Sequence, residues 1–326
     1  RGNEKVLTAR LEDAKFFFEE DTKRSLDQYV EPLKQVIYHK KLGSSYEKVL
    51  RIEALAHYLG EQACPESQAT LERAARLCKA DLVTQMVGEF PELQGTMGGI
   101  YASQSGEPEE VAKAIREHYM PVSAEGDLPE SQEGALLSLA DKMDTVVGFF
   151  GIGAPVSGTS DPFGMRRRAI GILRVLLAKD LEVPLSEFVA TGLQVLGGLV
   201  KKEPKKVQEE VIEFFRLRYH QFLMGKGFPH DTIESVLSSS FDNIPDLYRR
   251  VATLDKMRSE PDFEKLILGC KRAVNILQQA GRDFGYEGSG GPLQEEDLEE
   301  AAEKALLAAT SQVGRELAGW VESREY

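Results

Sequence analysis

Hydrophobic positions recur every three or four residues along most of this 326-residue chain. Val49, Ile52 and Ala56 follow this spacing, and Ser44 with Glu47 forms a capping box at the start of the same segment. Apolar positions with this period line one face of an α-helix, whereas a half-buried strand alternates apolar and polar residues. No sustained alternation is found along the chain. The pattern predicts an all-α fold.

Further helices are predicted where the same period or a helix-start signal occurs. Aspartate before a helix and proline in its first turn are such signals. The predicted segments are a helix opened by Pro65 and running to about Val87, one opened by Pro108, one through residues 136–147, one starting at Asp161-Pro162, one through residues 211–222 and one capped by Asp231. The glycine-rich residues 95–99 lack the lysine of a nucleotide loop and are expected to let a helix end turn tightly.

Two glycine-rich breaks divide the chain. Residues 148–158 hold four glycines among apolar residues and predict a packed loop, whereas residues 281–292 hold five glycines and predict a flexible connection. We expect an N-terminal connecting segment at residues 1–29, one helical domain at 30–180 and a second at 181–326. The three cysteines lie far apart in the sequence, which fits a reducing compartment.

The formal net charge of −13 argues against a general polyanion binder. Residues 161–226 nevertheless carry 12 basic and 8 acidic groups. Clustered guanidinium and ammonium groups suit phosphate backbones, although a solvated charged face is the simpler alternative. The clustered candidates are Arg166, Arg167, Arg168, Lys201, Lys202, Lys205 and Lys206.

A second group of candidates lies near residue 272. Arg272 and Asn275, next to Lys271, are three residues apart and would share one helix face. Such side chains can reach base edges, with structural hydrogen bonding as the alternative. The apolar residues 274, 276 and 277 are expected to hold this helix against the core.

Asp141 late in an all-α domain is typical of HD-type phosphohydrolases, which hold a metal with a His, a His-Asp pair and a distant Asp. Lys48 stands where the first His is needed, and Cys78 and Lys79 stand where the His-Asp pair falls. A lysine ammonium cannot ligate a metal at neutral pH. We therefore expect a degenerate centre with no metal and no catalytic residue. The literal His230-Asp231 pair is explained by helix capping.

Several long stretches, in order, resemble the β subunit of bacterial-type, tetrameric glycyl-tRNA synthetase. They are residues 2–6, 10–18, 79–90, 94–98, 140–145, 150–153 and 161–167. The resemblance covers nearly the whole chain and weakens after about residue 280. It implies a degenerate HD-like domain followed by a helical anticodon-binding domain similar to that of arginyl-tRNA synthetases, which this chain leaves incomplete at its C-terminus.

The resemblance also implies function. The partner α subunit carries aminoacylation with ATP and magnesium, and the β subunit recognises glycine-specific tRNA, with residues 271–277 near the anticodon. The implied location is cytoplasmic or organellar, with no membrane association. Two alternatives are a metal-dependent phosphohydrolase, which Lys48 opposes, and a helical scaffold that binds only protein. A salt-dependent affinity for tRNA would distinguish the scaffold from the tRNA-binding subunit.

Overall fold

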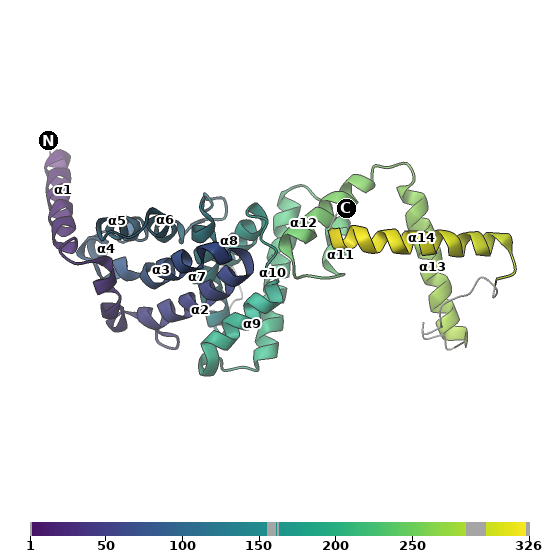
Figure 1. The fold of residues 1–326 in the computed structure, drawn as a ribbon, viewed down its shortest axis with the longest axis horizontal. Helices are drawn as coiled ribbons and strands as arrows, with labels where there is room; N and C mark the ends of the chain where they lie inside the picture. The colour runs from purple at the N-terminus through teal and green to yellow at the C-terminus, as the bar shows by residue number, and fades with distance from the viewer. Residues whose placement is uncertain (1, 155–160, 162, 285–297, 324–326) are drawn as a thin grey trace. The chain divides into compact units, whose positions relative to one another are not determined.

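The structure is a computed structural model that describes residues 2–154, 161, 163–284 and 298–323, and these ranges are almost entirely helical (Figure 1). The predicted all-α class is confirmed. The hairpin of β1 (Ile37–His39) and β2 (Gly43–Ser44) is an addition that the sequence pattern did not predict. Its strands are too short to show a period of two, and Gly43 supplies the positive φ of 86° at its turn.

The chain forms two compact units, Arg1–Gly227 with Leu237–Pro245, and Phe228–Val236 with Asp246–Tyr326. The first holds both strands and these helices: α1 (Gly2–Asp21), η1 (Leu26–Tyr29), η2 (Glu31–Gln35), α2 (Ser45–Ala63), η3 (Pro65–Ser67), α3 (Gln68–Leu77), η4 (Ala80–Val83), α4 (Gln85–Glu89), η5 (Pro91–Leu93), α5 (Thr96–Gln104), α6 (Glu109–Glu117), α7 (Gln132–Gly151), α8 (Met165–Ala178), α9 (Leu185–Leu196), η6 (Gly197–Leu199) and α10 (Pro204–Gly225). Helices α9 and α10 follow the predicted domain boundary near residue 180, and they pack with α7 in this unit. The boundary itself stays a prediction.

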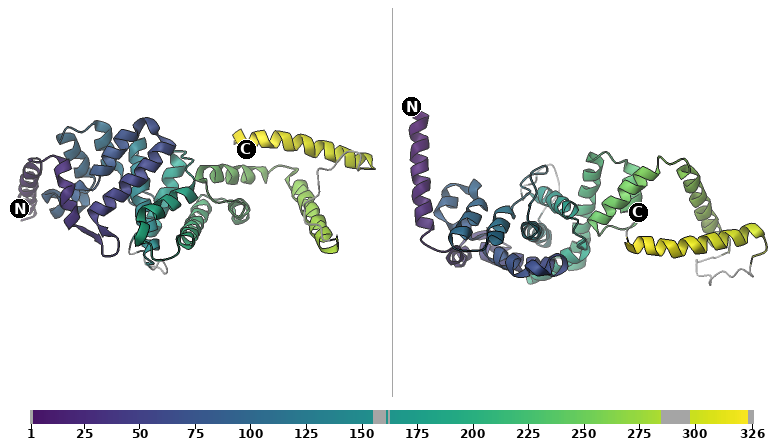
Figure 2. Two further views of the ribbon diagram at one scale, coloured as in Figure 1. Left: turned by 60° about the horizontal axis from the view of Figure 1, so that its bottom comes forward. Right: turned by 45° about the horizontal axis from the view of Figure 1, so that its top comes forward.

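Helix α7 is the centre of the first unit. It packs against α2, α3, α6, α8, α9 and α10 (Figure 2). All its side chains from Gly134 to Gly151 are buried. The hydroxyl of Ser131 caps the helix by accepting a hydrogen bond from the Gly134 N–H at 3.0 Å. Because neighbours surround α7, its polar residues must find partners inside the protein.

The predicted single helix from Pro65 to about Val87 is wrong, because this segment breaks into η3, α3, η4 and α4. The carboxylate of Asp81 accepts hydrogen bonds from the N–H groups of Gly95 (2.6 Å) and Gly98 (3.1 Å). The hydroxyl of Thr84 caps α4. Side chains that bond to backbone outside their own helix favour such breaks. Gly95, with φ +79°, makes the predicted tight turn at the start of α5 rather than at a helix end.

The start of α8 differs from the prediction. The helix begins at Met165, after Gly164 in the left-handed conformation, and not at Asp161. The carboxylate of Asp161 still accepts hydrogen bonds from the N–H groups of Met165 (2.7 Å) and Arg166 (3.1 Å). Asp161 thus satisfies the free donors of the first turn from a position further upstream. Pro162 lies outside the described residues.

The second unit is built from α11 (His230–Leu237), α12 (Ile244–Met257), α13 (Phe263–Phe284) and α14 (Ala301–Ser323). Asp231 lies inside the first turn of α11 and not at the predicted N-cap. Its carboxylate accepts a hydrogen bond from the N–H of Thr232 and pairs with Arg258 at 2.6 Å. The expectation that residues 274, 276 and 277 face the core is wrong, because these side chains are at least half exposed. Most of the predicted connection at 281–292 falls outside the described ranges.

Candidate functional site

The candidate site is a buried polar centre between α2, α7 and the segment that follows α3. Helix α2 supplies Lys48 and Arg51, and α7 supplies Asp141 and Asp144, each pair one helical turn apart. The capping box of Ser44 and Glu47 fixes the start of α2 and thereby the direction of its two cations. Two cations of α2 thus face two carboxylates of α7.

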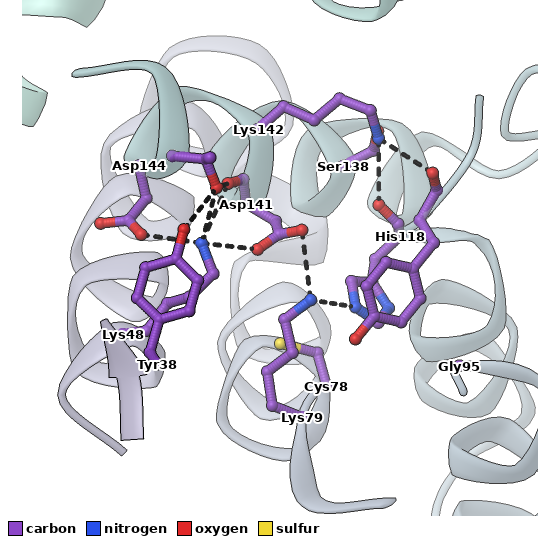
Figure 3. A network of polar contacts seen from close by, with 12 residues as sticks. Tyr38, Lys48, Cys78, Lys79, Gly95, His118, Ser138, Asp141, Lys142 and Asp144 are labelled. Atoms are coloured by element: carbon purple, nitrogen blue, oxygen red, sulfur yellow. Dashed lines mark hydrogen bonds and ion pairs between the residues drawn. The ribbon is translucent and has the colours of Figure 1, made fainter. Parts of the chain in front are cut away.

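Asp141 is held by two lysines (Figure 3). Its Oδ1 lies 3.0 Å from Lys48 Nζ, and its Oδ2 lies 3.1 Å from Lys79 Nζ. All three side chains are buried. Burial favours the neutral acid, but the charges of Lys48 and Lys79 outweigh it and hold the pKa of Asp141 well below its usual range. The structure therefore brings together three of the four predicted degenerate HD positions.

The fourth position, Cys78, is buried beside this group and does not bond to Asp141. Its thiol donates to the carbonyl of Ala75 at 3.2 Å. Burial raises the pKa of the Cys78 thiol to about 12. The side chain is therefore a neutral thiol at pH 7, without the thiolate that reacts or binds metals.

Lys48 has further partners. Its ammonium donates to Asp144 Oδ2 at 2.8 Å and to the hydroxyl of Thr145 at 2.9 Å, and it lies over the ring of Tyr38. Burial opposes the charge, but Asp141 and Asp144 more than compensate, so the pKa of Lys48 is raised. Arg51 Nε donates to Asp144 Oδ1 at 2.5 Å. Both carboxylates of α7 are thus paired.

Lys79 contacts an imidazole as well as a carboxylate. His118 Nδ1 lies 2.5 Å from the carbonyl oxygen of Ile115, which assigns the ring proton to Nδ1 and leaves Nε2 to accept from Lys79 Nζ at 2.8 Å. Burial, followed by the charge of Lys79, lowers the pKa of His118 well below its usual range. Burial also lowers the pKa of Lys79, against the attraction of Asp141. His118 is therefore a neutral acceptor.

Lys142 of α7 reaches the backbone that follows α6. Its ammonium donates to the carbonyls of Tyr119 (3.1 Å) and Met120 (2.7 Å) and to the hydroxyl of Ser138 (2.8 Å). No carboxylate pairs with it directly in the part of the chain that the structure describes. Burial, together with the charges of Lys79 and other nearby cations, lowers the pKa of Lys142 to about 7.

The HD-type architecture that the sequence predicts would hold a metal, but the donor set at this centre does not fit one. Metals of this class are held by imidazole nitrogens and carboxylate oxygens. Here Lys48 and Lys79 place ammonium groups against both oxygens of Asp141. The direct partners of Asp141 are thus cations that repel a metal ion and offer no lone pair.

A cleft of about 240 Å³ opens beside the centre, lined by residues that include Tyr119, Asp141, Lys142, Arg167 and Arg168. A neighbouring hollow of about 180 Å³ shares Tyr119, Asp141 and Arg168 with it. The guanidinium of Arg168 donates to the carbonyl of Phe163 at 2.7 Å. Cations therefore dominate this cleft, although the chain as a whole is acidic.

The predicted nucleic-acid candidates lie at or next to three different helices, α8, α10 and α13. Arg167 is exposed in the first turns of α8, whereas Arg166 and Arg168 are half-buried. The four lysines at 201–206 are exposed around the start of α10, and Lys202 pairs with Glu210 at 2.8 Å. Lys271, Arg272 and Asn275 are exposed on α13, in the second unit.

The sequence analysis did not identify His118, Asp144 or Lys142 as members of this centre. Asp144 had a signal, because it follows Asp141 by one turn just as Arg51 follows Lys48. No local pattern marks His118, which only the packing of α6 against α3 and α7 brings to Lys79.

The fold and the centre define an all-α protein whose polar core is organised by lysines in place of metal ligands. None of the helices in the described ranges is both long and apolar enough to cross a membrane. The family profile described as glycyl-tRNA synthetase beta subunit matches residues 1–238. The chain belongs to this family.

Three similar proteins carry the description glycine–tRNA ligase beta subunit. The one from Syntrophus aciditrophicus is 45% identical over 279 residues, which are 86% of this chain and 40% of that protein. Those from Citrifermentans bemidjiense and Geobacter sulfurreducens are 44% and 43% identical over all 326 residues, or 46% of each relative. The chain spans less than half the length of these relatives.

Proposed function

We propose that this chain is the tRNA-recognition part of a glycine–tRNA ligase beta subunit. The observation that carries the proposal is the family match over residues 1–238, continued by relatives that align over the whole chain. In this proposal a separate α subunit activates glycine with ATP and magnesium and transfers it to glycine-specific tRNA in the cytoplasm. The HD-like centre has a structural role, because its lysines oppose a metal.

The proposed tRNA contacts are the exposed cations around the starts of α8 and α10 and one face of helix α13. Lys205 and Lys206 lie in the first turn of α10, where positive charge opposes the helix dipole and costs a few tenths of a kcal/mol each. Phosphate binding would offset that cost. Arg167 is the exposed member of the three arginines of α8. Arg272 and Asn275 are proposed to face the anticodon.

A gel-shift titration with glycine-specific and non-cognate tRNA tests this proposal. Lys205→Glu/Lys206→Glu should weaken tRNA binding and reduce the dependence of log Kd on log salt by about one per lost phosphate contact. The matched control is Lys40→Glu/Lys41→Glu, which reverses two exposed lysines of the same unit. Equal losses in both double variants would reject a specific role for α10.

Charging assays test the division of labour. The chain alone, with glycine, ATP and tRNA, should give no glycyl-tRNA above background, because the resemblance assigns activation to the α subunit. Release of pyrophosphate that depends on glycine would contradict this part of the proposal. An absence of any salt-dependent tRNA affinity would favour a helical scaffold that binds protein.

A further inference from the structure

The cleft beside the lysine-held centre has an excess of positive charge that the centre does not use. Asp141 lines the cleft, but lysine ammonium groups occupy both of its oxygens. Three further basic side chains, Lys142, Arg167 and Arg168, line the same cleft, and the two arginines carry its permanent positive charge. Glu92 is the one other acidic residue in this lining, and its side chain is exposed.

The guanidinium groups of Arg167 and Arg168, which both line the cleft, converge on Gly164. A Cβ atom added to Gly164 would collide with Arg168 Nη1 and lie 3.0 Å from Arg167 Nη2. Both groups thus lie against the same glycine, at the point where α8 begins. Arg167 makes no hydrogen bond or ion pair within the described part of the chain, and Arg168 bonds to a backbone carbonyl.

Two guanidinium groups held close together repel one another. The positive charge of Arg168 also acts on the buried Lys142 and helps to lower its pKa. An anion in the cleft would relieve this repulsion and accept hydrogen bonds from both arginines. Paired guanidinium groups match the oxygens of a phosphate, which can accept two parallel N–H bonds from each.

The volume limits the ligand. At about 30 Å³ per water molecule, a cleft of 240 Å³ holds roughly eight waters. That space fits a phosphate and a small attached group, and it is below the range of about 300–1,000 Å³ for drug-sized ligands. We infer that the cleft lined by Lys142, Arg167 and Arg168 binds the phosphate group of a small phosphomonoester.

Calorimetric titration of the whole chain tests this inference with inorganic phosphate, glycerol 3-phosphate and glycerol. Phosphate and glycerol 3-phosphate should bind one site in competition, and glycerol should not bind. Arg167→Gln should weaken phosphate binding about tenfold to a hundredfold. Arg167→Lys should lose less. Lys40→Gln, which removes an exposed charge elsewhere in the same unit, should bind like the unchanged chain.

Arg167 is exposed, so its substitution should leave the fold intact, and an unchanged melting temperature should confirm this. Absence of saturable binding below about 10 mM, or equal affinities for Arg167→Gln and Lys40→Gln, would overturn the inference. A 12-nucleotide RNA with a 5′-hydroxyl provides the last arm. If it displaces phosphate and depends equally on Arg167, the group bound is a backbone phosphate and the small ligand is rejected. The inference moves Arg167 from the proposed tRNA contacts to the small ligand, and the rest of the tRNA proposal is tested separately by Lys205 and Lys206.

Discussion

Replacing Asp141 with asparagine should destabilise the first unit far more than a typical substitution. The change keeps the shape of the side chain and removes the negative charge that lies 3.0 Å from Lys48 Nζ and 3.1 Å from Lys79 Nζ. Lys48 keeps Asp144 at 2.8 Å as a partner. Of the polar partners of Lys79 in the described part of the chain, only the neutral imidazole of His118 then remains. The variant therefore leaves one buried ammonium without a counter-charge.

The size of the loss follows from two estimates. At an effective dielectric constant of 20, a pair of charges 3.1 Å apart attracts by about 5 kcal/mol. Alternatively, Lys79 can release its proton and be buried as a neutral amine. Deprotonating a lysine with the usual pKa of about 10.4 at pH 7 costs about 5 kcal/mol, at 1.36 kcal/mol per pH unit. Removing one partner of a buried pair typically costs about 3–5 kcal/mol. We expect Asp141→Asn to cost about 3–5 kcal/mol in the free energy of unfolding at pH 7.

Urea unfolding followed by circular dichroism, with hydrogen exchange on peptides of α2 and α7, measures this loss. The matched control is Asp127→Asn, an exposed carboxylate of the same unit, which should change stability by less than about 0.5 kcal/mol. Lys79→Met combined with Asp141→Asn should cost less than the sum of the single changes, because the unpaired ammonium is then absent. A loss below about 1 kcal/mol for Asp141→Asn would refute the claim that this carboxylate holds the centre together.

The pH dependence has a definite sign. The pKa of Asp141 is lowered in the folded protein, so its contribution is present above the pKa of the unfolded chain, near 3.9. That contribution is lost as the pH falls through the lower folded value. Asp141→Asn should therefore remove part of the acid sensitivity between about pH 4 and the onset of acid unfolding.

Three further predictions concern other residues. Lys142 has a pKa lowered to about 7, so between about pH 7 and 10 the unfolded chain binds more protons at this residue than the folded chain. The free energy of unfolding should therefore rise with pH in that window, and Lys142→Met should flatten the rise in urea titrations. Arg272→Ala and Asn275→Ala should cost about 1–3 kcal/mol in tRNA affinity if these side chains read bases, with the loss confined to tRNAs of unchanged anticodon, whereas equal losses on every tRNA would indicate backbone contact. Lys48→His/Cys78→His/Lys79→Asp should bind about one transition metal per chain by elemental analysis after dialysis, because it supplies imidazole and carboxylate ligands around Asp141; a stoichiometric metal in the unchanged chain would contradict the reading of the centre.

The sequence predicted the helical class because hydrophobic period and capping residues are local signals. Ser44 and Glu47 form the capping box that their spacing predicted. The failures came from long-range contacts. The segment from Pro65 to about Val87 has a helical pattern, yet Asp81 bonds to Gly95 and Gly98 and breaks it. Asp161 has the residue type of an N-cap but acts from upstream of Gly164.

The candidate site was predictable in part for the same reason. Lys48 and Lys79 were identified from the ligand positions that they replace and Asp141 from the one it keeps, and the structure brings all three together. That lysines would bond to the surviving carboxylate does not follow from ligand spacing, because either side chain could have turned toward solvent. The position of His118 depends on the packing of α6, and the convergence of Arg167 on Arg168 depends on the turn at Gly164.

The survival of Asp141 has a physical explanation in the charges of its neighbours. A buried carboxylate without a counter-charge is costly, so loss of a metal would be expected to remove Asp141 from an interior helix. A divalent cation brings two positive charges, and Lys48 and Lys79 also bring two. The two lysines are part of the chain and cannot dissociate as a metal ion can. They also provide neither the Lewis acid nor the bound water that a metal supplies. In the degenerate HD centre that the sequence predicts, this exchange replaces a metal suited to hydrolysis with fixed charges, and a phosphate in the neighbouring cleft would be bound without being cleaved.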